Sequence, residues 1–373
     1  TNTVTHTNNI EHFVGGAGIT DVLRLRDTVS NDISLAGQTF ELNGHSVTHD
    51  GFENLHVLMR DAADVLTGTV VIGESLDIAG DLIIETDSLS QRAEISATNV
   101  SFQINNLLDV PQDFDVINGS GDLQLIKATN LHLDAAGGAG YQAIPLLTDV
   151  DYIEVATSGA AAIVIIEADG LTIADVSITA TDVATETDSG LTTGNGGDIT
   201  VVNLSGELTI DEAINANGGD IHLVTDSITI ANQILSGTSA APRGTLILEP
   251  LSVTRRIDIA APTNLADAQS LHLTASELDL IINGFDDGID SVQLTNGQLE
   301  IVPGRDGITI GRIDGRHEVH IQAYEFEDSV TFRSPKIGGK FFVEGTLTTS
   351  EADTHGDNVE VRFVGSGFTN QIS

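Results

Sequence analysis

The sequence predicts an all-β fold, a right-handed parallel β-helix with about 20–24 residues in each coil. Three observations lead to this prediction. One stretch of sequence is repeated at a fixed step, short alternating segments follow one another along nearly the whole chain, and the apolar residues are almost all aliphatic. Each observation is typical of chains that bury their apolar faces only by stacking successive units.

The repeated stretch begins at Gly196 and again at Gly218. In each copy Gly-Gly-Asp precedes a short alternating segment, a second segment and a polar turn. A glycine-rich corner between short strands at such a step predicts stacked coils. Ile210 and Ile230 hold equivalent places in the two copies, so we expect them to point inward on neighbouring coils.

Segments that alternate between apolar and polar residues, rich in β-branched residues, occur throughout the chain. Gly, Asn or Asp separates them at short intervals, and this is a strand pattern without a competing helical stripe. At most a short helical turn is expected around Asn264–Ser270. Examples of the predicted strands are Ser75–Ile78, Asp81–Ile84, Ala162–Ile166, Leu171–Ile173, Val176–Ile178 and Thr245–Leu248.

The composition favours a narrow, aliphatic core. Hydrophobic residues make up 40% of the 373 residues, whereas aromatic residues make up 4% and tryptophan is absent. Tandem β-sandwiches, the alternative all-β arrangement, would have a much longer repeat and a buried aromatic residue in each domain. The 38 glycines against seven prolines fit many tight corners rather than a disordered linker.

The charge of the chain restricts its partners. With 15 basic and 55 acidic residues the formal net charge is −40, so we expect neither nucleic-acid binding nor membrane insertion. Cysteine is absent, which rules out disulfides and thiolate metal sites. The chain begins at Thr1, and we expect it to be a processed chain or a piece of a longer protein, with any export or anchoring signal outside this sequence.

We predict that residues 1–373 form one continuous β-solenoid. Within it, residues 1–130 have less regular coils and residues 131–240 have the most regular repeats. Residues 241–373 are richer in phenylalanine and basic residues, including Arg333, Lys336 and Lys340. In the pair Phe341-Phe342 alternation predicts one ring inside and one outside.

Several segments resemble the coils of filamentous-haemagglutinin-like proteins, which are large secreted bacterial surface adhesins. The resemblance covers about two thirds of the chain and has motifs of low specificity, since stacking geometry alone selects such sequences. The segments that show it are Gly51–Leu55, Ala62–Gly68, Gly244–Leu251, Arg256–Ile259, Leu271–Leu278, Gly307–Arg312, Ser329–Pro335, Gly338-Gly339 and Phe342–Thr349.

This resemblance implies a parallel β-helix that serves as a non-enzymatic stalk of an extracellular adhesin or surface filament in cell adhesion or biofilm formation. The expected location is the secreted or cell-surface compartment. The expected partners are neighbouring modules of the parent protein, with surface glycans or further copies of the chain as additional candidates. The alternatives are a carbohydrate-binding or polysaccharide-processing β-helix and a self-assembling extracellular filament protein.

Acidic turns supply the candidate metal ligands, since Ca²⁺ takes six to eight oxygen ligands. Asp and Asn are also ordinary turn residues, and we expect no cofactor unless calcium is bound. Gly15–Leu23 approaches a calcium-binding nonapeptide, but it has an extra residue and no second copy beside it, which favours a plain glycine corner. The candidate calcium ligands are Asp113, Asp115, Asp122, Asp286, Asp287 and Asp290.

No catalytic residues are predicted. His317 and His320 are three apart on a predicted strand and therefore face opposite sides, whereas Glu318 and His320 face the same side. His45 and His49 share a side, but no third ligand is placed near them, and a zinc site needs three or four. We expect these histidines to lie on the surface or in turns. A polysaccharide-processing site would need paired carboxylates or a suitable base on one face.

Overall fold

The computed structural model describes most of the chain. It covers residues 2–5, 12–14, 22–27, 32–37, 39–42, 45–50, 52–61, 63–108, 125–140, 145–178, 189–236, 244–262, 269–281, 291–295, 298–302, 307–349 and 359–365. The chain divides into two compact units, unit 1 (Thr1–Gly190) and unit 2 (Leu191–Ser373). The prediction of one continuous body from 1 to 373 stays a prediction.

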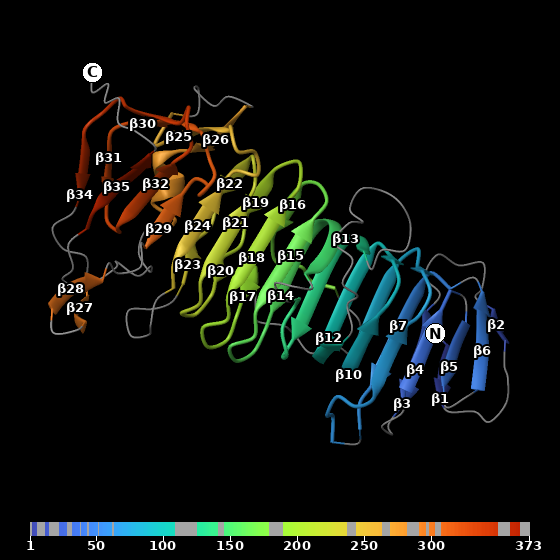
Figure 1. Cartoon of the computed structure of the whole chain (residues 1–373). Coiled ribbons are helices and arrows are strands. Elements are labelled where there is room, and N and C mark those ends of the chain that lie inside the picture. Colours follow the sequence, from blue (N-terminus) through green and yellow to red (C-terminus); the bar gives the residue numbers. More distant parts are fainter. Residues whose placement is uncertain are drawn as a thin grey trace. The chain divides into compact units, whose positions relative to one another are not determined.

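Unit 1 consists of β-strands (Figure 1, blue to green). In chain order they are β1 (Asn2–Thr5), β2 (His12–Val14), β3 (Val22–Asp27), β4 (Asp32–Ala36), β5 (Thr39–Leu42), β6 (His45–Asp50), β7 (Asn54–Met59), β8 (Thr69–Ile72), β9 (Leu76–Asp77), β10 (Asp81–Gln91), β11 (Ile95–Ser96), β12 (Asn99–Leu108), β13 (Leu125–Ala135), β14 (Leu146–Ala156), β15 (Ile163–Glu167) and β16 (Leu171–Ile173).

The core of unit 1 is a row of aliphatic side chains at matched positions on parallel strands. Strands β3, β7, β10, β12, β13, β14 and β16 pair in that order, each in parallel with the next. Stacking like side chains every 4.8 Å or so removes them from water without any need for bulky aromatics. The row consists of Leu23, Leu55, Leu82, Val100, Leu131, Ile153 and Ile173, all of them buried.

Two features break the regular pattern of unit 1. Strand β10 pairs with β7 through Leu82–Glu85 and with β8 through Ser88–Gln91, so one long strand borders two shorter ones. Near the N-terminus, β4 pairs with β5 and β5 with β6 in antiparallel fashion. The predicted lower regularity of residues 1–130 therefore includes an antiparallel meander, which the prediction of uniformly parallel strands did not contain.

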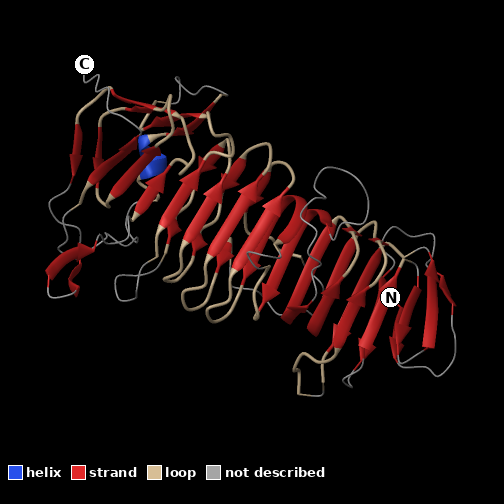
Figure 2. Ribbon diagram, in the orientation of Figure 1, coloured by secondary structure: helices blue, strands red, loops and turns tan. Residues whose placement is uncertain are grey.

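Unit 2 is also built of strands, with one short helix (Figure 2). Its elements are β17 (Leu191–Thr192), β18 (Ile199–Asn203), β19 (Leu208–Ile210), β20 (Ile214–Asn215), β21 (Ile221–Val224), β22 (Ile228–Ile230), β23 (Ile234–Leu235), β24 (Leu246–Glu249), β25 (Arg256–Ile259), β26 (Ser270–Leu273), α1 (Ala275–Leu278), β27 (Ser291–Thr295), β28 (Gln298–Val302), β29 (Ile308–Ile310), β30 (Glu318–Ile321), β31 (Tyr324–Phe326), β32 (Val330–Ser334), β33 (Lys340–Val343), β34 (Leu347–Thr349) and β35 (Val361–Gly365).

The repeated stretch of sequence forms consecutive layers of unit 2. Strand β18 pairs in parallel with β21, β19 with β22, and β17 with β20 and then β23 through the shared β20. Ile210 lies opposite Ile230, and both are buried. The prediction that these two isoleucines point inward on neighbouring layers is confirmed.

The Gly-Gly-Asp corner has a structural role in this stack. Asp198 Oδ1 accepts a hydrogen bond from the Asp220 backbone N–H at 2.9 Å, and Asp220 Oδ1 accepts one from the Thr245 N–H at 2.8 Å. Each aspartate thus satisfies a backbone donor of the next layer. A Cβ on Gly219 would collide with the Gly197 carbonyl, so the close stacking of the corners excludes a side chain there.

From β25 onward, unit 2 departs from the repeat. Strands β26, β25, β30 and β33 form a separate parallel sheet, and β27 and β28 form an antiparallel hairpin. Helix α1 begins at a capping box in which Thr274 and Glu277 each accept the other's backbone N–H. The helical turn expected around Asn264–Ser270 lies largely outside the described residues, and α1 follows five residues later.

The phenylalanines of this region divide between core and surface. Phe326 and Phe332 are buried with their ring centroids 5.9 Å apart. Phe341 and Phe342 are both partly exposed, so the predicted division into one buried and one exposed ring is wrong. Phe341 packs edge-on against Phe363, while Phe342 stacks on His320 at the other face of β33.

The described part of the chain is thus all-β, with parallel ladders in both units, compatible with a β-solenoid. Among the described residues no helix has the length and apolar character needed to cross a membrane.

Candidate functional site

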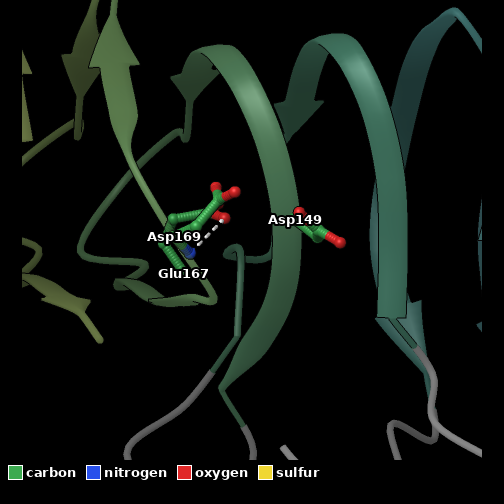
Figure 3. A group of neighbouring side chains, drawn as sticks. All are labelled: Asp149, Glu167 and Asp169. Atoms are coloured by element: carbon green, nitrogen blue, oxygen red, sulfur yellow. Dashed lines mark hydrogen bonds between the residues drawn. The ribbon is translucent and has the colours of Figure 1, made fainter. Parts of the chain in front are cut away.

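Three carboxylates of unit 1 converge at one corner: Asp149 in β14, Glu167 at the end of β15, and Asp169 in the turn before β16 (Figure 3). One oxygen from each lies within 4.8 Å of the others. Within the part of the chain that the structure describes, this is the one group of three or more acidic or histidine side chains spaced to hold a metal ion.

The strand register brings these residues together. Thr148 in β14 pairs with Glu167 in β15, which places Asp149 beside the end of β15. The bend Ala168–Gly170 then leads to Leu171, whose strand β16 also pairs in parallel with β14. Two neighbouring strands and one turn therefore supply the cluster.

Glu167 is the buried member of the cluster and has no exposed surface. Its Oε1 accepts hydrogen bonds from the backbone N–H groups of Val150 (3.2 Å), Ala168 (2.9 Å) and Asp169 (3.4 Å). Its Oε2 is buried and makes no hydrogen bond. Burial raises the pKa of Glu167 to about 7, and the hydrogen bonds that it accepts only partly oppose this effect.

Asp169 is exposed, yet its carboxyl pKa is also raised, first by partial desolvation and then by the charges of Asp149 and Asp151. Asp149 is half-buried and Asp151 is exposed. The negative charges of Asp149 and Asp151 therefore disfavour ionisation of Asp169. A bound cation would relieve this repulsion.

The geometry argues against acid–base catalysis at the cluster. A carboxyl of raised pKa next to a second carboxyl is the pattern of a general acid with its partner. A general acid, however, must come within hydrogen-bond reach of its substrate, and the Glu167 side chain has no surface to offer a polymer. Oxygen donors alone, without nitrogen or sulfur, suit a hard cation such as Ca²⁺.

The calcium ligands predicted from the sequence lie outside the described residues, as do residues 15–21 of the glycine-rich segment. The structure therefore neither assembles nor separates those six aspartates, and they stay a prediction. They are Asp113, Asp115, Asp122, Asp286, Asp287 and Asp290.

The histidines of unit 2 behave in different ways. His317 is fully buried, contrary to the expected surface or turn position. Its Nδ1–H donates to the Arg255 carbonyl at 2.8 Å, and its Nε2 accepts from the Arg312 N–H at 3.4 Å. His320 faces the other side and contacts Glu344 Oε1 at 2.9 Å. The predicted divergence of His317 and His320 is confirmed.

The sequence does contain a signal for the carboxylate cluster. Asp149 and Asp169 stand one repeat apart, 20 residues, at the polar ends of alternating segments. In a stack of coils such positions become neighbours. Acidic residues in a turn are common enough that this spacing alone did not distinguish the pair.

Comparison with known proteins gives no relative from which to assign a function: no family model, no curated protein and no solved structure matches this chain significantly.

Proposed function

We propose that this chain is a non-enzymatic structural module, a right-handed parallel β-helix that forms part of the stalk of a large secreted adhesin or surface filament. The observation that supports the proposal most is the unbroken row of buried aliphatic residues in each unit. In unit 2 that row comprises Ile199, Ile221, Leu246, Ile308 and Val330 at matched positions of consecutive paired strands.

Such a row distributes stability over the whole length of each unit. Each fully buried Ile, Leu or Val contributes about 1.5–3 kcal/mol by leaving water, and no single position dominates. This suits a module whose task is to hold other parts of a protein apart. At the polar corners, side chains accept hydrogen bonds from backbone N–H groups of the next layer, as Asp198 and Asp220 do.

The net charge of −40 is consistent with a surface that stays solvated and avoids nucleic acid and anionic membranes. The partners that we propose are the neighbouring modules of a longer parent protein. The resemblance to filamentous-haemagglutinin-like coils supports a proposed site of action outside the cell.

A carbohydrate screen tests the proposal directly. The full chain is applied to a glycan array and incubated with neutral and acidic polysaccharides, with and without calcium. We expect no saturable binding and no depolymerisation. Cleavage of any polymer, or selective retention on one glycan class, would overturn the structural role and favour a carbohydrate-processing or carbohydrate-binding β-helix.

One observation favours self-assembly as a second candidate function. Ile313 and Ile337 are 73% and 90% exposed. They lie on adjacent turns of unit 2, because the Lys336 N–H donates to the Gly315 carbonyl at 2.9 Å. Basic Arg316 and Lys336 flank them, so the surface complements a second, strongly acidic copy of this chain.

Sedimentation against protein concentration and salt tests this second candidate. Association that weakens in salt and disappears in the double variant Ile313→Ser/Ile337→Ser supports self-assembly. The control Val65→Ser removes an exposed apolar side chain of unit 1 and should leave the association unchanged. A monomer at all concentrations would exclude it.

A further inference from the structure

We propose that Asp149, Glu167 and Asp169 form a calcium site that fastens the corner shared by β14, β15 and β16. The site lies on residues other than the six aspartates predicted from the sequence, and the proposed structural role does not require it. The inference rests on the spacing of the three oxygens, on the unused buried oxygen of Glu167 and on the charge around them.

The spacing suits calcium. Ca²⁺ binds oxygen at about 2.3–2.6 Å, so any two of its oxygen ligands are at most about 5 Å apart. The three carboxylate oxygens lie within 4.8 Å of one another. They can therefore surround a calcium ion without a change in the backbone, and water can complete the six to eight ligands.

The second observation is the state of Glu167. The Oε1 atom of this side chain is held by three backbone N–H groups, which fix the carboxyl in place. Its Oε2 is buried and accepts no hydrogen bond of good geometry. The nearby Thr148 hydroxyl, which also contacts the Ile166 carbonyl at 3.5 Å, interacts with this carboxyl and only partly offsets its burial. A buried carboxylate oxygen without a partner is costly, and a cation bound between Asp149 and Asp169 would satisfy it.

The charged groups around the corner are mainly acidic. Asp151 in β14 adds to the negative field on Asp169. Lys127 in β13 is the register partner of Asp149, but its Nζ lies 3.1 Å from Glu94 Oε2. That lysine is thus shared with another carboxylate and leaves the corner with excess negative charge.

Isothermal titration of the full chain with CaCl₂ tests the site. We expect saturable binding at about 0.1–1 mM, the range typical of extracellular calcium modules, and weaker binding of Mg²⁺. Glu167→Gln and Asp169→Asn should each weaken the calcium affinity at least tenfold. Asp77→Asn, which removes an exposed carboxylate of unit 1, serves as the matched control and should bind as the wild type does.

Each result has a defined meaning. Weaker calcium binding by both site variants, with unchanged binding by Asp77→Asn, establishes the site. Asp169→Asn remains informative even if Glu167→Gln fails to fold, because Asp169 is exposed and its replacement should not disturb the fold. Absence of saturable binding to the wild type, or equal binding by the wild type and Asp169→Asn, would overturn the proposal.

Discussion

Ile210 and Ile230 lie directly opposite each other on the parallel strands β19 and β22, and both are buried. Replacing either by Asp would place an unpaired charge among aliphatic side chains. We expect a loss of about 4 kcal/mol or more in the free energy of unfolding of unit 2, measured by urea denaturation.

The matched control introduces the same charge at an exposed position nearby. Gln233→Asp should change the stability by less than about 0.5 kcal/mol, as surface substitutions usually do. An Ile230→Asp protein as stable as the Gln233→Asp protein would show that these isoleucines do not lie in a packed row.

Gly219 gives a test of the corner. A Cβ at this position would collide with the carbonyl of Gly197, and no flexible side chain can move aside. Gly219→Ala should therefore cost about 1–3 kcal/mol of stability. Gly73→Ala is the control, since its Cβ would lie 4.0 Å from the nearest atoms; it should be neutral or slightly stabilising. Thermal denaturation of the two variants compares them, and equal melting temperatures would contradict the stacked corners.

Much of this fold follows from the sequence because stacking imposes a repeat that can be recognised. The two copies of the repeated stretch predicted that Ile210 and Ile230 lie on neighbouring coils, and the structure pairs them directly. It likewise pairs Ile199 with Ile221, the residues that follow the two Gly-Gly-Asp corners. The antiparallel meander β4–β6 and helix α1 were not predicted. Both depend on local hydrogen bonds, such as the Thr274–Glu277 capping box, that leave no periodic trace.

The candidate site could not be predicted in the same way. Asp149 and Asp169 are one repeat apart, but the burial of Glu167 depends on where β15 ends and the chain bends towards β16. His317 illustrates the same limit. Alternation along the predicted strand indicated that His317 and His320 face opposite sides, but it did not indicate which side is the interior. The ring of His317 proves to be buried.

His317 makes unit 2 sensitive to acid. Burial lowers the pKa of this histidine below its ordinary value of 6.5, so the folded state favours the neutral ring. The neutral ring stabilises the fold fully above the unfolded pKa, and this stabilisation is lost as the pH falls through the folded pKa. Protonation would also place a hydrogen on Nε2, so this nitrogen could no longer accept the hydrogen bond from the Arg312 N–H.

We therefore expect the free energy of unfolding of the wild type to decrease below about pH 6.5, with a slope of at most about 1.4 kcal/mol per pH unit from this group. His317→Gln should show a shallower decrease in the same urea titrations between pH 5 and 8. Identical slopes for the two proteins would mean that the folded state does not discriminate against the charged ring.

Glu167 predicts the opposite pH dependence in unit 1. The folded pKa of about 7 lies above the ordinary glutamate value of 4.5. Between these two pH values the folded state therefore holds a proton that the unfolded chain releases. The contribution to stability is complete below about pH 4.5 and is lost as the pH rises through about 7. A shift of this size corresponds to about 3 kcal/mol.

Glu167→Gln, which is neutral at every pH, should lack this decrease in stability when both proteins are unfolded by urea in EDTA. The exposed Glu74→Gln should behave as the wild type does. If Glu167→Gln and wild type lose stability equally between pH 5 and 8, the carboxyl is ionised in the fold, and the buried corner must already neutralise its charge.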